Sequence, residues 1–247
     1  MTNRILTAFF SLFFIQSFMY AETIKAQYSV SYGLFGEIGI AKAFLRKDQN
    51  TYVIDIKLES TGLAKTLSKG RKERHISTGH IENGLMVSES YKVIRSYASK
   101  TVTKEYLIDH KNKKVVKNYK KEENNKQVSS RSEVLEYYAK NDLLTLYFNL
   151  DTLVKDKTNP QTYQFSAVGA EKQNGNVTLI IPKKNQLGDY KKTLGNHSAW
   201  YATAIIHQKI FSSEEGKLLL GVGADGITNK AVLKDVVFFG DIVAVKK

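Results

Sequence analysis

The sequence contains no cysteine and only two prolines among its 247 residues. The absence of cysteine excludes disulfides, thiolate metal ligands and thiol catalysis together. A chain of this size needs no disulfide when it can form a sufficient core, and 42% apolar and 11% aromatic residues are enough for one. The scarcity of proline excludes a proline-rich linker. The composition therefore fits one large all-β domain or two small ones.

Beyond its N-terminus the chain lacks any apolar run of the roughly 20 residues that a membrane-spanning helix needs. The N-terminus itself has the three-part pattern of a cleaved export signal: a basic Arg4, an apolar run over 5–18, and a small Ala21 at the cleavage position. No cysteine follows the run, which excludes a lipid-anchored start. We therefore expect a signal peptide over 1–21 and a single β-rich periplasmic domain over 22–247, with no transmembrane span in the mature chain.

Acidic residues are fewer than basic ones. The chain has 37 Lys and Arg against 24 Asp and Glu, a net charge of +13, which becomes +12 when Arg4 is removed with the signal. A cytoplasmic protein of this charge would suggest nucleic acid. An exported protein instead meets phospholipid head groups, lipopolysaccharide phosphates or acidic glycans. Simple solubility accounts for the same charge equally well.

Alternation of apolar and polar residues runs through most of the chain and predicts half-buried strands. Tyr28, Val30 and Tyr32 alternate with serines, and a second strand follows the turn at 33–36. The pairs Asn83-Gly84 and Asn174-Gly175 are strong hairpin signals, because both residue types tolerate positive φ. The polar segment 120–130 is typical of a hairpin tip. Further strands are expected at 71–82, 85–95, 98–110, 113–120, 161–169, 176–181, 199–211, 216–223 and 229–245.

Three segments favour helix. Apolar residues spaced by three and four over 132–154 predict an amphipathic helix, broken near Asn141, with Asp142 as the cap of its second part. Shorter helices are expected over 63–68 and 186–194. The predicted fold is mostly β, a curved antiparallel sheet (a half-barrel or sandwich-like meander) with one or two short helices packed on it. The concave side of such a sheet can hold an apolar ligand.

Four segments resemble a family of exported bacterial proteins known as domain-of-unknown-function 3108. They are the Tyr- and Gly-rich stretch 28–39, Thr61-Gly62-Leu63 before a short helix, the turn Glu82-Asn83-Gly84-Leu85, and the helix start Asp142-Leu143-Leu144-Thr145. Met86 stands where the family usually has proline. The resemblance covers 28–182 and implies a periplasmic β-rich protein, without an activity.

Two groups of basic residues are the candidate ligand-binding positions, as a rim that meets an anionic head. One group surrounds the predicted helix over 63–68, and the other lies near the predicted strand over 113–120. The alternative for the second group is an edge hairpin that lysine keeps soluble and unpaired. The candidate residues are Lys65, Lys69, Arg71, Lys72, Arg74, Lys111, Lys113, Lys114 and Lys117.

Catalytic and metal motifs are absent from the sequence. There is no Gly-x-Ser-x-Gly elbow and no His-Glu-x-x-His motif. His75 and His80 are an odd number apart in a predicted strand, which places them on opposite faces. We expect no catalytic residues, no metal and no cofactor, although a triad assembled in space would escape a motif search.

The leading hypothesis is a non-enzymatic periplasmic binding protein for an amphiphile or an anionic envelope component, a lipid or glycan. The alternative is a structural or assembly factor of the cell envelope that binds another protein or the cell wall through a sheet edge or a basic surface. A hydrolase with a cryptic site is the third possibility. Nucleic acid is not an expected partner.

Overall fold

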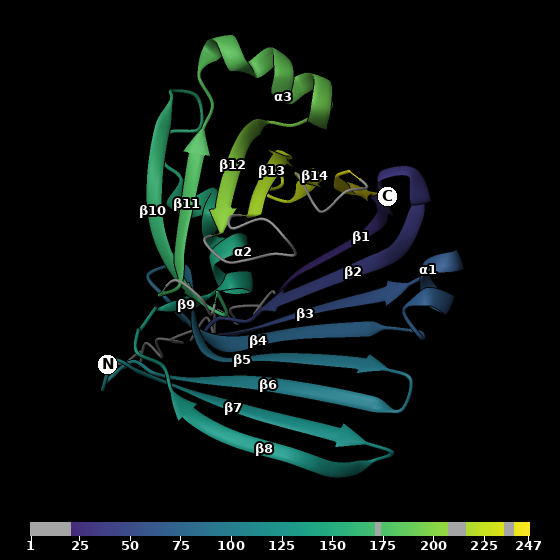
Figure 1. Cartoon of the computed structure of the whole chain (residues 1–247). Coiled ribbons are helices and arrows are strands. Elements are labelled where there is room, and N and C mark those ends of the chain that lie inside the picture. Colours follow the sequence, from purple (N-terminus) through teal and green to yellow (C-terminus); the bar gives the residue numbers. More distant parts are fainter. Residues whose placement is uncertain (1–20, 171–173, 207–215, 235–239) are drawn as a thin grey trace, which may run out of the picture.

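Strands make up most of the chain and join into a single sheet. The computed structural model describes residues 21–170, 174–206, 216–234 and 240–247; the predicted signal peptide lies outside them, except for Ala21. The strand order is β8-β7-β6-β5-β4-β3-β2-β1-β15-β14-β13-β12-β11-β10-β9 (Figure 1). The strands are β1 (Glu22–Tyr32), β2 (Glu37–Lys47), β3 (Thr51–Ser60), β4 (Lys72–Glu82), β5 (Leu85–Tyr97), β6 (Lys100–Asp109), β7 (Lys114–Glu123), β8 (Lys126–Val134), β9 (Asn141–Asp142), β10 (Gln161–Val168), β11 (Asn176–Ile181), β12 (Trp200–Ile206), β13 (Gly216–Val222), β14 (Thr228–Leu233) and β15 (Ile242–Lys246).

Pairing between chain neighbours gives this order. Each of the strands β1 to β7 pairs antiparallel with the next strand along the chain, as the strands of a meander do. Strands β10 to β15 form a second antiparallel meander, with β9 parallel to β10 at its end. The pairing of β15 with β1 joins the two meanders, with Tyr28 opposite Lys246. The expected curved, mostly β fold is confirmed.

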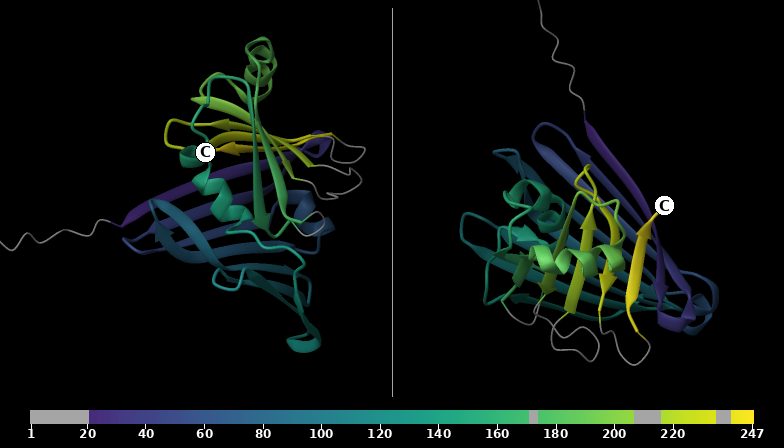
Figure 2. Two further views of the ribbon diagram at one scale, coloured as in Figure 1. Left: turned by 90° about the vertical axis from the view of Figure 1, so that its left-hand side faces the viewer. Right: turned by 90° about the horizontal axis from the view of Figure 1, so that it is seen from above.

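Helices occupy both sides of the sheet. The short elements η1 (Gly33–Phe35) and α1 (Gly62–Leu67) follow β1 and β3 at one end of the sheet. Helix α2 (Leu143–Leu153) lies between the two meanders, on the inner face of the curve (Figure 2). Element η2 (Lys184–Gln186) leads into α3 (Leu187–Leu194), whose Leu194 packs with Tyr201 and Val232 on the other face.

The core lies around α2. Leu146 and Leu150 pack against Leu179 and Trp200 of the second meander. Leu144 and Phe148, on the other side of the helix, pack against the first meander in a cluster formed by Leu45, Tyr52, Ile54 and Met86. In addition to the pairing of β1 with β15, the two halves of the sheet are therefore held together through one 11-residue helix.

A buried hydrogen-bond cluster fixes the start of this helix. The Asp142 carboxylate accepts from the backbone N–H groups of Leu144 (2.8 Å) and Thr145 (3.1 Å), as an N-cap does. Its second oxygen accepts from the hydroxyls of Ser77 (2.5 Å) and Thr145 (2.7 Å). The Tyr52 hydroxyl lies 2.7 Å from Thr145 Oγ1. Burial, with the negative charge of Asp142, raises the pKa of Tyr52 to about 12. Tyr52 therefore stays neutral at physiological pH. Through Tyr52 and Ser77, the cluster joins α2 to β3 and β4.

A glycine lets the sheet bend next to this cluster. The pairing of β4 with β5 shifts between Thr78 and Gly79. A Cβ on Gly79 would lie 1.9 Å from the Val87 carbonyl oxygen and 2.9 Å from the Tyr52 ring. Only glycine allows the two strands to approach this closely.

Two sequence predictions are wrong in part. Residues 132–134 end the edge strand β8, and within the predicted helix 132–154 the helix begins only at Leu143. Leu135 and Tyr138 mimic helical spacing because an extended segment places both against the cluster of Tyr91 and Tyr106. The predicted cap at Asp142 is confirmed.

The expected single strand over 229–245 is instead two strands, β14 and β15, which pair antiparallel with Leu233 opposite Ile242. The sequence interpretation joined them because apolar residues stand on both sides of Gly240-Asp241. The aromatic pair Phe238-Phe239 and the end of the predicted strand over 199–211 lie outside the described residues.

Removing the cap should cost much of the stability. We expect Asp142→Ala to lower the free energy of unfolding by about 3 kcal/mol, since it removes a cap and leaves buried hydroxyls unsatisfied. Urea denaturation followed by circular dichroism measures this. Asp189→Ala, at an exposed position in the first turn of α3, is the control and should change stability by less than about 0.5 kcal/mol. Equal effects of the two substitutions would contradict the anchoring role of Asp142.

Candidate functional site

Helix α2 covers only part of the inner face of β1 to β3. Along β3, the inward residues Tyr52 and Ile54 are almost fully buried, but Ile56 and Leu58 are only half-buried. Two hollows lie over the uncovered part. The smaller, about 190 Å³, lies between Ile56, the α2 residues Tyr147 and Phe148, and strands β13 to β15. The larger, about 560 Å³, lies further along the same strands and is called here the α1 groove.

The α1 groove is lined by residues at one end of β1, β2 and β3 and by one face of the helix that follows β3. Val30 and Tyr32 come from β1, and Leu58 from β3. The two hollows take successive inward positions of the same strands, for example Tyr28 and then Val30. A volume of this size falls in the range of small-molecule sites, roughly 300–1,000 Å³.

The outer wall of the groove consists of α1 and η1. Phe35 stacks on Tyr32, with ring centroids 5.8 Å apart. Leu63 and Leu67 line the groove from α1, and they are 67% and 70% exposed. The Thr61 N–H donates to the Ile38 carbonyl at 3.0 Å and the Ser68 hydroxyl to Ser60 at 3.1 Å, which fastens both ends of the helix to the sheet. No residue of α1 is buried, so this helix covers the groove without joining the core.

A charged cluster borders the groove. Arg71 and Glu73 line it, and the Arg71 Nε donates to Glu73 Oε1 at 2.8 Å. On the next strand, the Arg95 Nε donates to Glu73 Oε2 at 3.1 Å. Two guanidinium groups thus share one carboxylate, which leaves one positive charge in excess at the border of an apolar groove.

The environment keeps Glu73 ionised. Burial alone raises the pKa of its carboxyl, but the hydrogen bond from His75 and the charges of Arg95 and Arg71 outweigh burial and lower this pKa to about 2. His75 Nε2 lies 3.3 Å from Glu73 and Nδ1 lies 2.8 Å from the Tyr91 hydroxyl. Because an ionised carboxylate only accepts, Nε2 carries the proton in this contact, and a neutral His75 accepts from Tyr91 at Nδ1.

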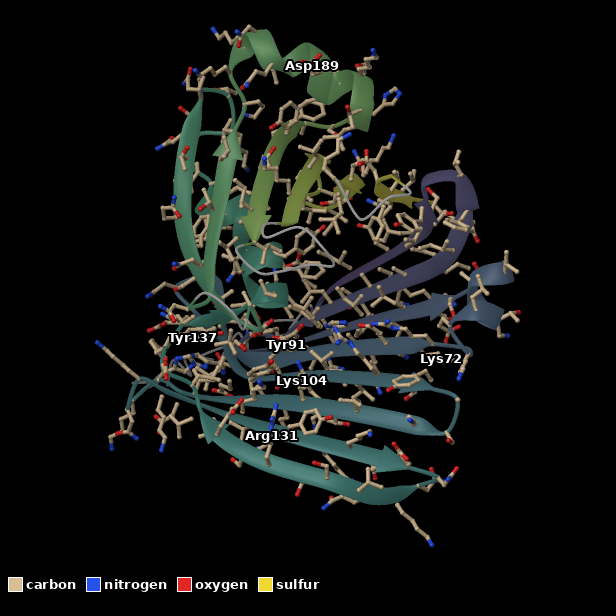
Figure 3. The ribbon with its side chains drawn as sticks, in the orientation of Figure 1. Lys72, Tyr91, Lys104, Arg131, Tyr137 and Asp189 are labelled. Atoms are coloured by element: carbon tan, nitrogen blue, oxygen red, sulfur yellow. The ribbon has the colours of Figure 1, made fainter. Side chains whose placement is uncertain are left out.

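The first group of predicted basic residues surrounds the groove, but only Arg71 lines it. Lys65 lies on α1, and Lys69 in the turn after it; both are exposed. Lys72 lies at the same end of the sheet (Figure 3), 3.9 Å from Glu59. Arg74 points to the outer face, where it binds both oxygens of Asp55 at 2.9 Å.

The second group lies at the opposite end of the sheet. Tyr97, at the α1 end of β5, pairs with Lys100, the first residue of β6. Strand β6 therefore runs away from α1, and the turn that carries Lys111 and Lys113 lies at its far end (Figure 1). Lys114 begins β7, and Lys117 is 6% exposed and bonds to Glu133 at 2.9 Å. The two groups do not converge on one site.

The sequence interpretation missed Glu73, His75 and Arg95, because their meeting depends on the register of β4 with β5. It also missed the exposed apolar residues Leu34 and Phe35. A signal for these was present, since a Leu-Phe pair stood between two glycines in a turn, where polar residues are usual.

Other chemistries find little support in the described part of the chain. No three side chains there come together as metal ligands. Within the same residues no serine hydroxyl bonds to a histidine ring; His110 bonds instead to the Tyr138 hydroxyl (2.8 Å) and the Ser88 carbonyl (2.7 Å). None of the helices described has the length and apolar character of a membrane span.

Comparison with known proteins supports the fold only. No family model matches the sequence, and no curated protein matches it. The structure is similar to the crystal structure of a beta-barrel-like protein of domain of unknown function DUF1849 from Brucella abortus. The TM-score is 0.51 at 10% sequence identity, over 90% of this chain and 94% of that one. At this identity the likeness shows a shared β-barrel-like architecture, and the resemblance to family 3108 stays a prediction.

The charge cluster predicts a specific acid dependence. The pKa of Glu73 is lower in the folded state than its ordinary value of 4.5, so its ionisation stabilises the fold above about pH 4.5, and this contribution is lost as pH falls toward 2. We expect the stability difference between the wild type and Glu73→Gln to shrink across this interval. Urea denaturation of both proteins between pH 7 and pH 2 measures it. A difference that does not change with pH would contradict the role given to Glu73.

Proposed function

We propose that the protein is a non-enzymatic binding protein for an amphiphile, exported to the periplasm. An acyl or similar apolar chain lies in the α1 groove, and its anionic head meets Arg71 at the border. The observation that carries the proposal is the pairing of an apolar groove of about 560 Å³ with an excess positive charge on one inner face.

The groove is suited to this ligand energetically. Each methylene that leaves water contributes about 0.8 kcal/mol. A chain of about ten methylenes would supply roughly 8 kcal/mol, the scale of a micromolar Kd before the cost of immobilisation. The head group adds little by itself at a half-open border, so chain length sets affinity and Arg71 sets the preference for a negative charge.

Blocking the groove tests whether the acyl chain lies in it. Leu58→Trp adds a large ring at an inward position of β3 and should weaken binding of dodecanoate at least tenfold, because the ring takes the volume of the chain. Isothermal titration calorimetry measures this. Lys57→Trp, one residue earlier on the outer face, is the matched control and should bind as the wild type does. Equal affinities of all three proteins would contradict the groove as the site.

Removing the charge of Arg71 tests whether this residue binds the anionic head group. Arg71→Gln should weaken dodecanoate binding by about 1–2 kcal/mol, as expected for the loss of a hydrogen bond to a charged group that is partly exposed. Binding of dodecanol, which has the same chain but no charge, should be unchanged. Arg74→Gln removes the same charge from the outer face and should alter neither. If Arg71→Gln weakened the binding of dodecanoate and of dodecanol equally, Arg71 would only support the local fold and would not bind the head group.

One observation favours the assembly-factor alternative. Strand β8 ends the sheet and all nine of its residues are exposed, so its outer edge offers backbone groups for pairing with another protein. The same titrations decide between the two roles. If neither dodecanoate nor dodecanol binds the wild type, the amphiphile role fails and the β8 edge becomes the stronger candidate.

A further inference from the structure

Bulky apolar side chains gather at the mouth of the α1 groove and point into solvent. We call Leu34 and Phe35 of η1, with Leu63 and Leu67 of α1, the apolar rim. Their exposed fractions are 98%, 50%, 67% and 70%. Three of the four line the groove, and Leu34 is the chain neighbour of Phe35, so the rim is one surface. The described residues include eight exposed large apolar side chains, and half of them lie here.

Such a surface is unusual on a water-exposed protein and marks an interaction site. The rim is not needed for the fold, because α1 and η1 bury none of their residues. The strands behind it already have their own core around α2. Apart from the stacking of Phe35 on Tyr32, the four side chains add nothing to the buried core, and an apolar environment would stabilise them.

Positive charge surrounds the rim. Lys65 projects from α1 and Lys69 from the turn after it, and neither has an ion-pair partner among the residues that the structure describes. The nearby acidic groups already have partners: Glu37 lies 3.7 Å from Lys247, Glu59 3.9 Å from Lys72, and Glu73 binds two arginines. Apolar side chains flanked by lysine are typical of segments that insert into the interface of an anionic bilayer.

We propose that the apolar rim docks on an anionic lipid bilayer. Leu34, Leu63 and Leu67 enter the boundary between head groups and acyl chains, and Lys65 and Lys69 lie at the level of the lipid phosphates. This goes beyond ligand binding in the groove and does not require the groove to be filled. Docking of this kind would open the α1 groove onto the acyl layer, the place from which an amphiphile is taken or to which it is given.

Fluorescence quenching tests the insertion directly. The only native tryptophan, Trp200, is 4% exposed and gives a constant background. Leu34→Trp adds a reporter on the rim, and Val128→Trp adds one at an exposed position of β8. With vesicles of phosphatidylglycerol and phosphatidylcholine brominated in their acyl chains, we expect strong quenching of Leu34→Trp, but none of Val128→Trp or the wild type.

A charge-matched pair tests the role of the lysines. Lys65→Gln/Lys69→Gln and Lys111→Gln/Lys113→Gln remove the same charge from opposite ends of the sheet. The first should lower the vesicle partition coefficient by about tenfold or more, because each lysine near an anionic surface contributes to binding. The second should bind as the wild type does. Vesicles of phosphatidylcholine alone should bind all variants weakly, and circular dichroism confirms that each variant is folded.

Two results would overturn the proposal. One is Leu34→Trp fluorescence that brominated vesicles leave unchanged. The other is a wild type that sediments as a dimer, becomes monomeric in Leu34→Glu/Leu67→Glu, and does not bind vesicles, which would make the rim an interface between copies. Failure of the amphiphile role can be told apart from failure of membrane docking. In that case brominated vesicles would still quench the fluorescence of Leu34→Trp, although dodecanoate would not bind.

Discussion

The structure depends on how one buried carboxylate positions one helix inside a curved sheet. Asp142 caps α2 and binds hydroxyl groups that face it from β4 and from the helix itself. A curved sheet of this length has a large inner face that must be removed from water, and α2 is the helix that fills its centre. Because a helix is only about 10–12 Å across and the strands beneath it are about 35 Å long, the helix covers one part of β1 to β3 and leaves the rest open.

The open part has the properties of a ligand site and not of an incomplete core. Its lining is apolar at Val30 of β1 and Leu58 of β3 and becomes polar only at the border, and α1 and η1 form a wall over it without being buried. At the border, Glu73 holds Arg71 and Arg95 in place while leaving a net positive charge. An apolar groove, a cationic border and an exposed apolar rim at the same end of the molecule are the three features on which the proposed binding of an amphiphile and the proposed membrane docking both rest.

Much of this fold was predictable because strands and tight turns leave local signals. Alternation located β3 to β7, and Asn83-Gly84 and Asn174-Gly175 marked true hairpins whose residues have positive φ. The pairing of β1 with β15 was not predictable, since it joins residues some 200 positions apart. Of the charged cluster, only Arg71 was predictable from the sequence. Its neighbours Glu73 and Arg95 meet because of the register in which β4 pairs with β5. Lys111 and Lys113 looked similar in the sequence, but the direction of β6 places them far from the groove.

The most direct test is native mass spectrometry of the wild type and Leu58→Trp, purified without detergent from the periplasm of the natural host. We expect one amphiphile bound per chain in the wild type, identified after solvent extraction, and none in Leu58→Trp. An unliganded mass for the wild type that does not change after incubation with dodecanoate would show that the inner face of the sheet does not hold an apolar ligand.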